Sequence, residues 1–214
     1  MLRDGLMAAL FAEDPLWKPE WVEARGEATI RARAAPKDIK FYCGWFCPFA
    51  QRAWIACEEK GIDYQYIDVN PYEVDDKNPG GYTKRTLPLG VKRERYPEFV
   101  AVSPRGLVPG LDVSGEQVWD SMAVVEYIND RFDGPTFLPG SALERAHVRI
   151  FIAQFNDRVW APYMKMLMAQ DAAVQEAARK ALLEGCHELA KAMSTEGPFF
   201  LGDRFSLFEI VTAG

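Results

Sequence analysis

The sequence predicts an α/β domain followed by an all-α domain. The first observation is a β-prone segment at 38–42, a helical pattern at 47–60 and an alternating segment at 63–69. A strand, a helix and a strand within about thirty residues form a unit whose two strands lie parallel. The second observation is a stretch rich in glycine and proline at 133–141, after which the apolar pattern is wholly helical.

These patterns divide the chain into four parts. We expect an N-terminal extension over 1–36, an α/β domain over 37–133, a linker over 134–141 and a helical domain over 142–214. Near the end, Ser206-Leu-Phe-Glu209 has the spacing of a capping box, which predicts a helix start. Because so little chain follows that start, we expect the helical domain to be truncated.

Cys47 stands where the first helix should begin, and Pro48 follows at a position that favours proline. A thiol there faces helix amides without intrahelical partners and the positive end of the helix dipole. Both favour the thiolate, which is the reactive form of cysteine. The alternative is inert packing, which is common for free cysteine and which we expect for Cys57 in the same helix.

The rest of the α/β domain is less regular. We expect an irregular loop over 70–97, a short helix over 96–102, a hairpin of strands at 111–113 and 117–119, and a helix that begins at Asp120 or Ser121. The loop contains a cluster of basic residues, either an anion site or a solvated surface: Lys84, Arg85, Lys92, Arg93 and Arg95.

Pro109 precedes the first strand of that hairpin. A proline there is a candidate for a cis peptide bond that exposes the backbone of Val108 to a ligand. The helix start at Asp120 and Ser121 has two interpretations, capping alone or a grip on the carboxylate and ammonium of a ligand.

The second half is predicted to contain two long helices. The first runs from 142 to about 160, and Pro162 should interrupt or kink it. The second runs over 171–193, with apolar residues at steps of four, three and four: Leu182, Cys186, Leu189 and Met193. This spacing predicts that Cys186 lies in the core.

Composition excludes several classes of function. The net charge of −6 argues against a nucleic-acid-binding protein, and there is no apolar run long enough to span a membrane. Two histidines and four scattered cysteines, without a Cys-x-x-Cys pair, argue against a metal site and a disulfide framework. The N-terminus lacks the features of a secretory signal, so we expect a cytoplasmic protein in a reducing compartment.

Together, these features resemble the cytosolic glutathione transferases, with a thioredoxin-like glutathione-binding domain first and an all-α domain second. The segment Cys47-Pro-Phe-Ala-Gln-Arg52 is similar to the cysteine motif of the omega class, and the plant lambda class has a closely similar one. Ala53-Trp-Ile55 fits the lambda class, whereas Asn70-Pro-Tyr72 and Ser103-Pro-Arg-Gly-Leu-Val-Pro109 look more like microbial omega-type enzymes. The resemblance covers residues from about 38 to 214.

The resemblance implies roles for individual residues. Cys47 would form a mixed disulfide with glutathione, beside Phe49. The backbone of Val108, before a cis Pro109, would pair with the cysteinyl part of the tripeptide. The γ-glutamyl amine and carboxylate would be held by Asp120 and Ser121.

Two parts of the ligand site are less well defined by the resemblance. The insertion over 70–95 departs from the omega pattern, so Lys84 and Arg95 are both candidates for the glycyl carboxylate. Trp160 and Tyr163 would either line the co-substrate site or pack in the core.

The implied activity is a glutathione-dependent thiol transferase or reductase. Ala50 occupies the position of a resolving cysteine, so glutathione itself would release the mixed disulfide. The partners would be glutathione and a small electrophilic or oxidised co-substrate, with a homodimer implied by the omega class and a monomer by the lambda class. The alternatives are a conjugating transferase and a protein that binds apolar ligands or associates with membranes without turnover.

Overall fold

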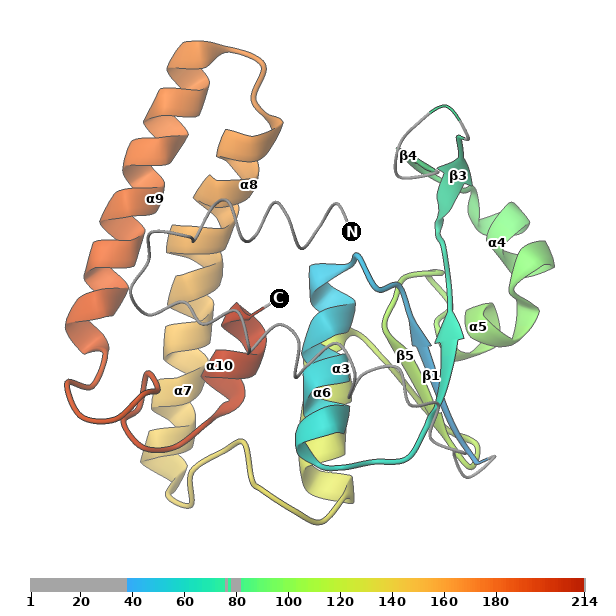
Figure 1. The fold of residues 1–214 in the computed structure, drawn as a ribbon, viewed down its shortest axis with the longest axis horizontal. Helices are drawn as coiled ribbons and strands as arrows, with labels where there is room; N and C mark the ends of the chain where they lie inside the picture. The colour runs from blue at the N-terminus through green and yellow to red at the C-terminus, as the bar shows by residue number, and fades with distance from the viewer. Residues whose placement is uncertain (1–37, 76, 78–81, 214) are drawn as a thin grey trace, which may run out of the picture. The chain divides into compact units, whose positions relative to one another are not determined.

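The computed structural model describes residues 38–75, 77 and 82–213. The expected N-terminal extension over 1–36 lies outside these residues. A four-stranded sheet in the order β2-β1-β5-β6 forms the centre of the first half (Figure 1). Its strands are β1 (Ile39–Cys43), β2 (Gln65–Asp68), β5 (Gly110–Val113) and β6 (Glu116–Trp119).

The pairing of these strands follows from the connections between them. β1 pairs with β2 in parallel through the crossover helix α3 (Pro48–Glu59), as the strand–helix–strand pattern predicts. β5 pairs antiparallel with both β1 and β6, and a short turn joins β5 to β6, which confirms the predicted hairpin.

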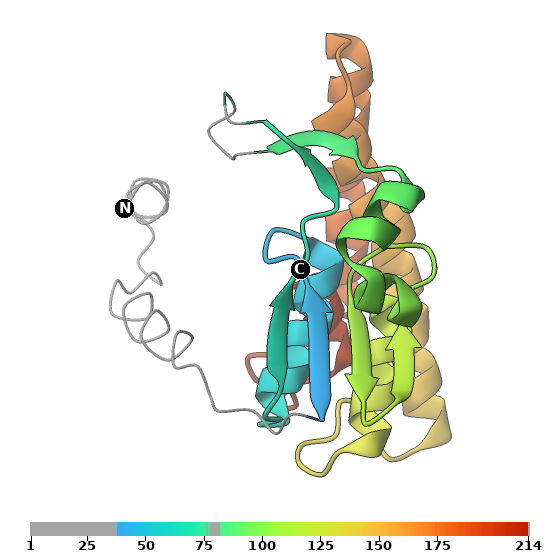
Figure 2. The same cartoon turned by 90° about the vertical axis from the view of Figure 1, so that its right-hand side faces the viewer.

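Helices cover both faces of this sheet (Figures 1 and 2). On one face lie α3 and α6 (Ser121–Arg131), which pack against each other. On the other lies α5 (Pro97–Val102), which begins at a proline and buries Phe99 and Val102 against Tyr42 of β1. The predicted short helix over 96–102 is therefore confirmed.

The segment 70–97 is more regular than its composition suggested. It contains a hairpin of β3 (Tyr72–Val74) and β4 (Tyr82–Thr86), followed by α4 (Leu89–Arg95). The prediction of an irregular loop was wrong. The helix and strands in this segment are too short to show a periodic pattern, and prolines stand at their ends. Lys92 links α4 to the loop that precedes β5. Its side chain is buried, and its Nζ donates to the carbonyl of Gly106 at 2.9 Å.

In the described part of the second half, the regular elements are helices. The first predicted helix corresponds to α7 (Ala142–Phe155), η1 (Asn156–Trp160) and α8 (Ala161–Met168), which follow one another without a break. Pro162 does not end the helix. Instead, η1 is a turn of π-helix, and Pro162 sits in the first turn of α8. The second predicted helix is α9 (Ala172–Ala192), which packs against η1 and α8.

Cys186 is exposed on α9, so its predicted place in the core was wrong. The buried face of this helix is formed by Ala178, Gly185 and Leu189. Two neighbouring residues such as Gly185 and Cys186 point in directions about 100° apart on a helix, so the face that includes the glycine leaves the cysteine in solvent. Cys57, by contrast, is fully buried, as predicted.

The last described helix, α10 (Leu207–Thr212), packs against both α3 and α7. Ser206 and Glu209 form the predicted capping box in full. Through α10, one apolar cluster runs from the sheet and α3 to α7 and α9. No helix within the described residues is long and apolar enough to cross a membrane.

Candidate functional site

Cys47 is the residue immediately before α3. It has extended backbone angles, its amide donates to the carbonyl of Gly44 at 2.9 Å, and its carbonyl accepts from the amide of Gln51 at 3.0 Å. Pro48 occupies the first turn, as predicted. Within the described residues the half-buried sulfur caps no helix amide. The thiol therefore stands at the start of a helix without being committed to its cap.

The two cysteines nearest in sequence are in a different environment. Cys43 ends β1 and Cys57 lies in α3, and both are fully buried. Burial raises the pKa of the Cys43 thiol from 9.0 to about 12, and it raises the pKa of Cys57 as well. Both thiols therefore stay protonated near neutral pH.

The peptide bond between Val108 and Pro109 is cis, as the sequence suggested. It lies in the loop between α5 and β5. The hydroxyl of Ser103 holds this loop, since it donates to the carbonyl of Leu107 at 2.7 Å and accepts from the amide of Leu107 at 3.3 Å. In the part of the chain that the structure describes, the backbone of Val108 forms no backbone hydrogen bond.

Asp120 and Ser121 begin α6. Asp120 is the cap of the helix: its φ is +75° and its carboxylate accepts from the amide of Met122 at 3.1 Å. A positive φ is uncommon outside glycine, although aspartate tolerates it better than most residues. Ser121 is buried. Both interpretations of this helix start, capping and ligand binding, remain compatible because a carboxylate accepts more than one hydrogen bond.

Arg52 links α3 to α10, and sequence analysis did not single it out. Its side chain is 3% exposed, and its Nε donates to the carbonyl of Val211 in α10 at 3.1 Å. Burial lowers the pKa of the Arg52 guanidinium, while the charges of Asp120 and Cys47 act in the opposite direction. Among the described residues, its Nη2 atom has no hydrogen-bond partner. The only available signal was an arginine on an otherwise apolar face of α3.

Phe49, two residues after Cys47 in the sequence, belongs to a group of aromatic rings. The ring of Phe49, which is 40% exposed, has the guanidinium of Arg52 at 4.9 Å on one side. The ring of Trp160 in η1 lies 5.6 Å from it, edge to face. Tyr163 of α8 continues the group, with its ring 5.8 Å from Trp160. The structure thus brings together three of the predicted residues from the two halves of the chain.

The two candidates for the glycyl carboxylate are not distinguished. Arg95 ends α4, and its guanidinium lies 5.5 Å from the ring of Tyr96. Lys84 lies in β4, and its side chain is outside what the structure describes. The assignment of either residue to a ligand stays a prediction.

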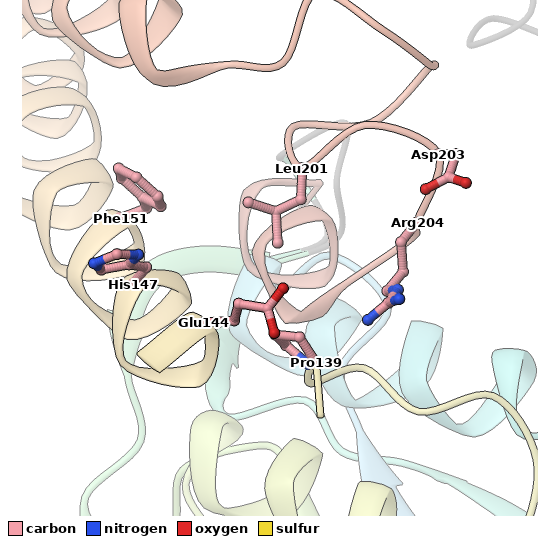
Figure 3. A pocket seen from close by; sticks show the side chains of 7 residues that line it. All are labelled: Pro139, Glu144, His147, Phe151, Leu201, Asp203 and Arg204. Atoms are coloured by element: carbon pink, nitrogen blue, oxygen red, sulfur yellow. The ribbon is translucent and has the colours of Figure 1, made fainter. Parts of the chain in front are cut away.

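A separate pocket of about 230 Å³ lies between the start of α7 and the loop before α10 (Figure 3). Its polar groups are partly engaged: hydrogen bonds from Ser141 and the charge of Arg204 lower the pKa of Glu144. None of the predicted site residues lines this pocket, which is formed by Pro139, Glu144, His147, Phe151, Leu201, Asp203 and Arg204.

Comparison with known proteins identifies the family. Residues 46–131 match the model of the glutathione S-transferase N-terminal domain. A rice protein, IN2-1 homolog A, is 30% identical over 204 residues, which cover 95% of this chain and 74% of the rice protein. This chain belongs to the glutathione transferase family. The family fold confirms the predicted thioredoxin-like domain followed by a helical domain.

Two further relatives of this chain come from a plant and a fungus. Maize protein IN2-1 is 32% identical, and the match covers 80% of this chain and 61% of the maize protein. The crystal structure of glutathione transferase Omega 3C from Trametes versicolor superposes with a TM-score of 0.71 at 31% identity, covering 87% of this chain and 75% of the fungal one. The relatives of this chain thus include a protein named as an omega glutathione transferase as well as IN2-1 proteins.

Proposed function

We propose that this glutathione transferase is an omega-like, or lambda-like, thiol transferase in which Cys47 forms a mixed disulfide with glutathione. The observation that carries the proposal is the half-buried thiol at the start of α3, uncommitted to the helix cap. Conjugating enzymes instead need a hydroxyl that activates glutathione and leaves it free to attack. A thiol at this position favours covalent capture of the glutathionyl group.

The proposed reaction has two thiol–disulfide exchanges. The Cys47 thiolate attacks the glutathionyl sulfur of a disulfide between the co-substrate and glutathione. The Cys47–glutathione bond forms as the old disulfide bond breaks, and the co-substrate leaves as a thiolate that takes a proton from water. A second glutathione thiolate then attacks the Cys47 adduct, which releases oxidised glutathione and restores the Cys47 thiolate. Ala50 cannot replace this second glutathione because it has no sulfur.

The glutathione side of the site would lie on the thioredoxin-like half. The unpaired backbone of Val108, beside the cis Pro109, could receive the cysteinyl part of the tripeptide in strand-like pairing. Asp120 would accept from the γ-glutamyl ammonium, and the hydroxyl of Ser121 would donate to its carboxylate. The amides at the start of α6 favour that carboxylate further.

The co-substrate side would be aromatic. Phe49 belongs to the thioredoxin-like half, whereas Trp160 and Tyr163 come from the helical half. Aromatic rings offer large apolar contact areas to a small oxidised or electrophilic molecule. We therefore propose that the helical half selects the co-substrate while the first half binds glutathione.

The experiment that tests the proposal is mass spectrometry after incubation with oxidised glutathione. We expect one added glutathionyl group, mapped to the peptide that contains Cys47, together with turnover of a glutathionylated substrate. Cys47→Ser should abolish both. Cys186→Ser is the matched control, since it removes an exposed thiol far along the chain in α9. Retention of transferase activity in Cys47→Ser would refute the mechanism.

The proposal extends to the cellular location and the oligomeric state. We propose a cytoplasmic location and, if the omega class applies, a homodimer. One relative, glutathione S-transferase L2 of Arabidopsis thaliana, is named chloroplastic and is 28% identical to this chain. Fractionation and light scattering would test the location and the oligomeric state.

A further inference from the structure

The π-turn η1 has an identifiable cause in the sequence. In a regular α-helix the ring of Pro162 would clash with the carbonyl four residues earlier, that of Arg158, and proline has no N–H to donate to it. A π-turn relieves this conflict by inserting one extra residue, and the amide of Ala161 bonds to the carbonyl of Asn156, five residues back. The Arg158 carbonyl is thereby displaced from its usual place in the helix.

The displaced carbonyl lies against α9, at the position where Gly185 has no side chain. A Cβ atom at position 185 would lie 1.9 Å from the Arg158 oxygen and 2.6 Å from its carbonyl carbon. Both are backbone atoms, so no side-chain rotation could relieve the overlap. Gly185 is also buried on the face of α9 that packs against η1. Only glycine allows the two helix backbones to approach this closely.

The π-turn also carries Trp160, two residues after Arg158. The Trp160 ring contacts Phe49 of α3 with centroids 5.6 Å apart and Tyr163 at 5.8 Å. Any shift of the Arg158 carbonyl away from α9 must move this short turn, and with it the indole ring. Single turns of π-helix occur frequently at functional sites.

We propose that Gly185 is a specificity-determining position, because by admitting the Arg158 carbonyl it fixes where Trp160 stands opposite Phe49. This inference rests on the proposed function, which places the co-substrate against these rings. Gly185 touches no substrate itself. It is a positioning residue that acts through η1, and it should influence aromatic co-substrates without affecting the glutathione contacts of the first half.

The test uses two unreactive thioethers, S-methylglutathione and S-benzylglutathione, and their dissociation constants by calorimetry. The dissociation constant of S-methylglutathione divided by that of S-benzylglutathione measures how much the benzyl group adds to the affinity. We expect S-benzylglutathione to bind the native protein more tightly by on the order of tenfold. Trp160→Ala and Gly185→Ala should both bring this ratio close to one while leaving the affinity for S-methylglutathione within about twofold.

Gly90→Ala is the matched control. Gly90 is also a helical glycine, in α4, but a Cβ atom there would have no neighbour within 4 Å. This variant should keep the full ratio. If Gly185→Ala keeps the ratio while Trp160→Ala loses it, the role of Gly185 is refuted and the proposed function stands. If the native protein binds neither thioether, the proposed function fails, and the role of Gly185 fails with it.

If Gly185→Ala does not fold, a second variant tests whether the π-turn sets the position of Trp160. Pro162→Ala removes the ring clash and restores an N–H group at position 162, so the segment 156–160 can return to α-helical pairing without any change in α9. Trp160 would then rotate away from Phe49, and the ratio should fall as in Gly185→Ala. A folded Pro162→Ala protein, checked by circular dichroism, that keeps the full ratio would overturn the proposal.

Discussion

At the scale of single residues, the four cysteines show how environment decides chemistry. Cys43 and Cys57 are fully buried, Cys47 is half-buried at a helix start, and Cys186 is exposed on α9. A buried thiol loses the hydration that would stabilise its charged form, so it stays protonated and protected. Among the four cysteines, Cys47 alone combines partial exposure with a position immediately before a helix.

This difference predicts a pattern of alkylation. With iodoacetamide near neutral pH we expect modification at Cys47 and Cys186 and protection of Cys43 and Cys57, measured by peptide mapping.

In the unfolded chain the Cys43 thiol ionises near 9.0, but in the native protein it ionises only near 12. The native state therefore holds the proton over this range, and the free energy of unfolding should fall as the pH rises from about 9 towards 12. Rapid modification of Cys43 in the native protein would contradict this assignment.

Arg52 is the residue whose importance only the structure reveals. Its Nε bonds the carbonyl of Val211, and its guanidinium lies on the ring of Phe49. Arg52→Lys keeps the charge but loses the planar group that makes both contacts. We expect the free energy of unfolding to fall by about 1–3 kcal/mol, as for other buried polar groups that lose a partner.

Urea unfolding would measure this effect. Arg131→Lys is the control, because Arg131 also lies over a phenylalanine ring, 5.7 Å from that of Phe132, but its side chain is 52% exposed. It should change the stability little. Equal losses in both variants would show that burial of Arg52 contributes nothing specific.

At the scale of elements, two capping boxes of the same type differ in burial. Ser141 begins α7 at an exposed position, whereas Ser206 begins α10 and is fully buried. At α10 the hydroxyl of Ser206 donates to Glu209 at 2.7 Å, and Glu209 also accepts from the amide of Phe200 at 2.8 Å. This cap therefore also fixes the loop that precedes the helix.

Alanine at the two positions should therefore have different effects. Ser206→Ala should lower the free energy of unfolding by about 2 kcal/mol, because it removes the cap and leaves buried polar groups without a partner. Ser141→Ala should cost about 0.5–1 kcal/mol, since water can replace the exposed hydroxyl. Chemical denaturation of both variants checks the order, and a larger loss at Ser141 would contradict it.

At the scale of the whole molecule, one apolar core joins the described parts of the two halves. Phe41 of β1 and Cys57 of α3 belong to the same buried cluster as Val148 of α7 and Ile210 of α10. A shared core means that neither half can lose its packing without exposing apolar surface of the other. We therefore expect the described part of the chain to unfold as one cooperative unit.

Ile210→Ala tests this coupling. The cavity left by the truncated side chain should lower the free energy of unfolding by about 2–5 kcal/mol. Circular dichroism reports on the helices of both halves together, whereas protection of the Cys57 thiol reports on the first half alone. Both midpoints should shift together. If the protection of Cys57 keeps its native midpoint, the two halves unfold independently.

Sequence alone determined the features that local physics decides. The strand–helix–strand unit, the cysteine before Pro48, the cap at Asp120 and the box at Ser206 follow from periodicity and hydrogen-bonding preference, which act over a few residues. The place of the cis bond before Pro109 also lay in the sequence, because it depends on a proline at a strand start.

Tertiary structure decided what depends on contacts between distant segments. The close approach of Arg158 to Gly185 determines which face of α9 is buried, and the spacing of apolar residues alone therefore misplaced Cys186. The burial of Arg52 depends on a carbonyl far along the chain, that of Val211, and the meeting of Phe49 with Trp160 depends on how two separate helices pack. Such contacts form between residues whose separation in sequence carries no pattern, and only the folded chain brings them together.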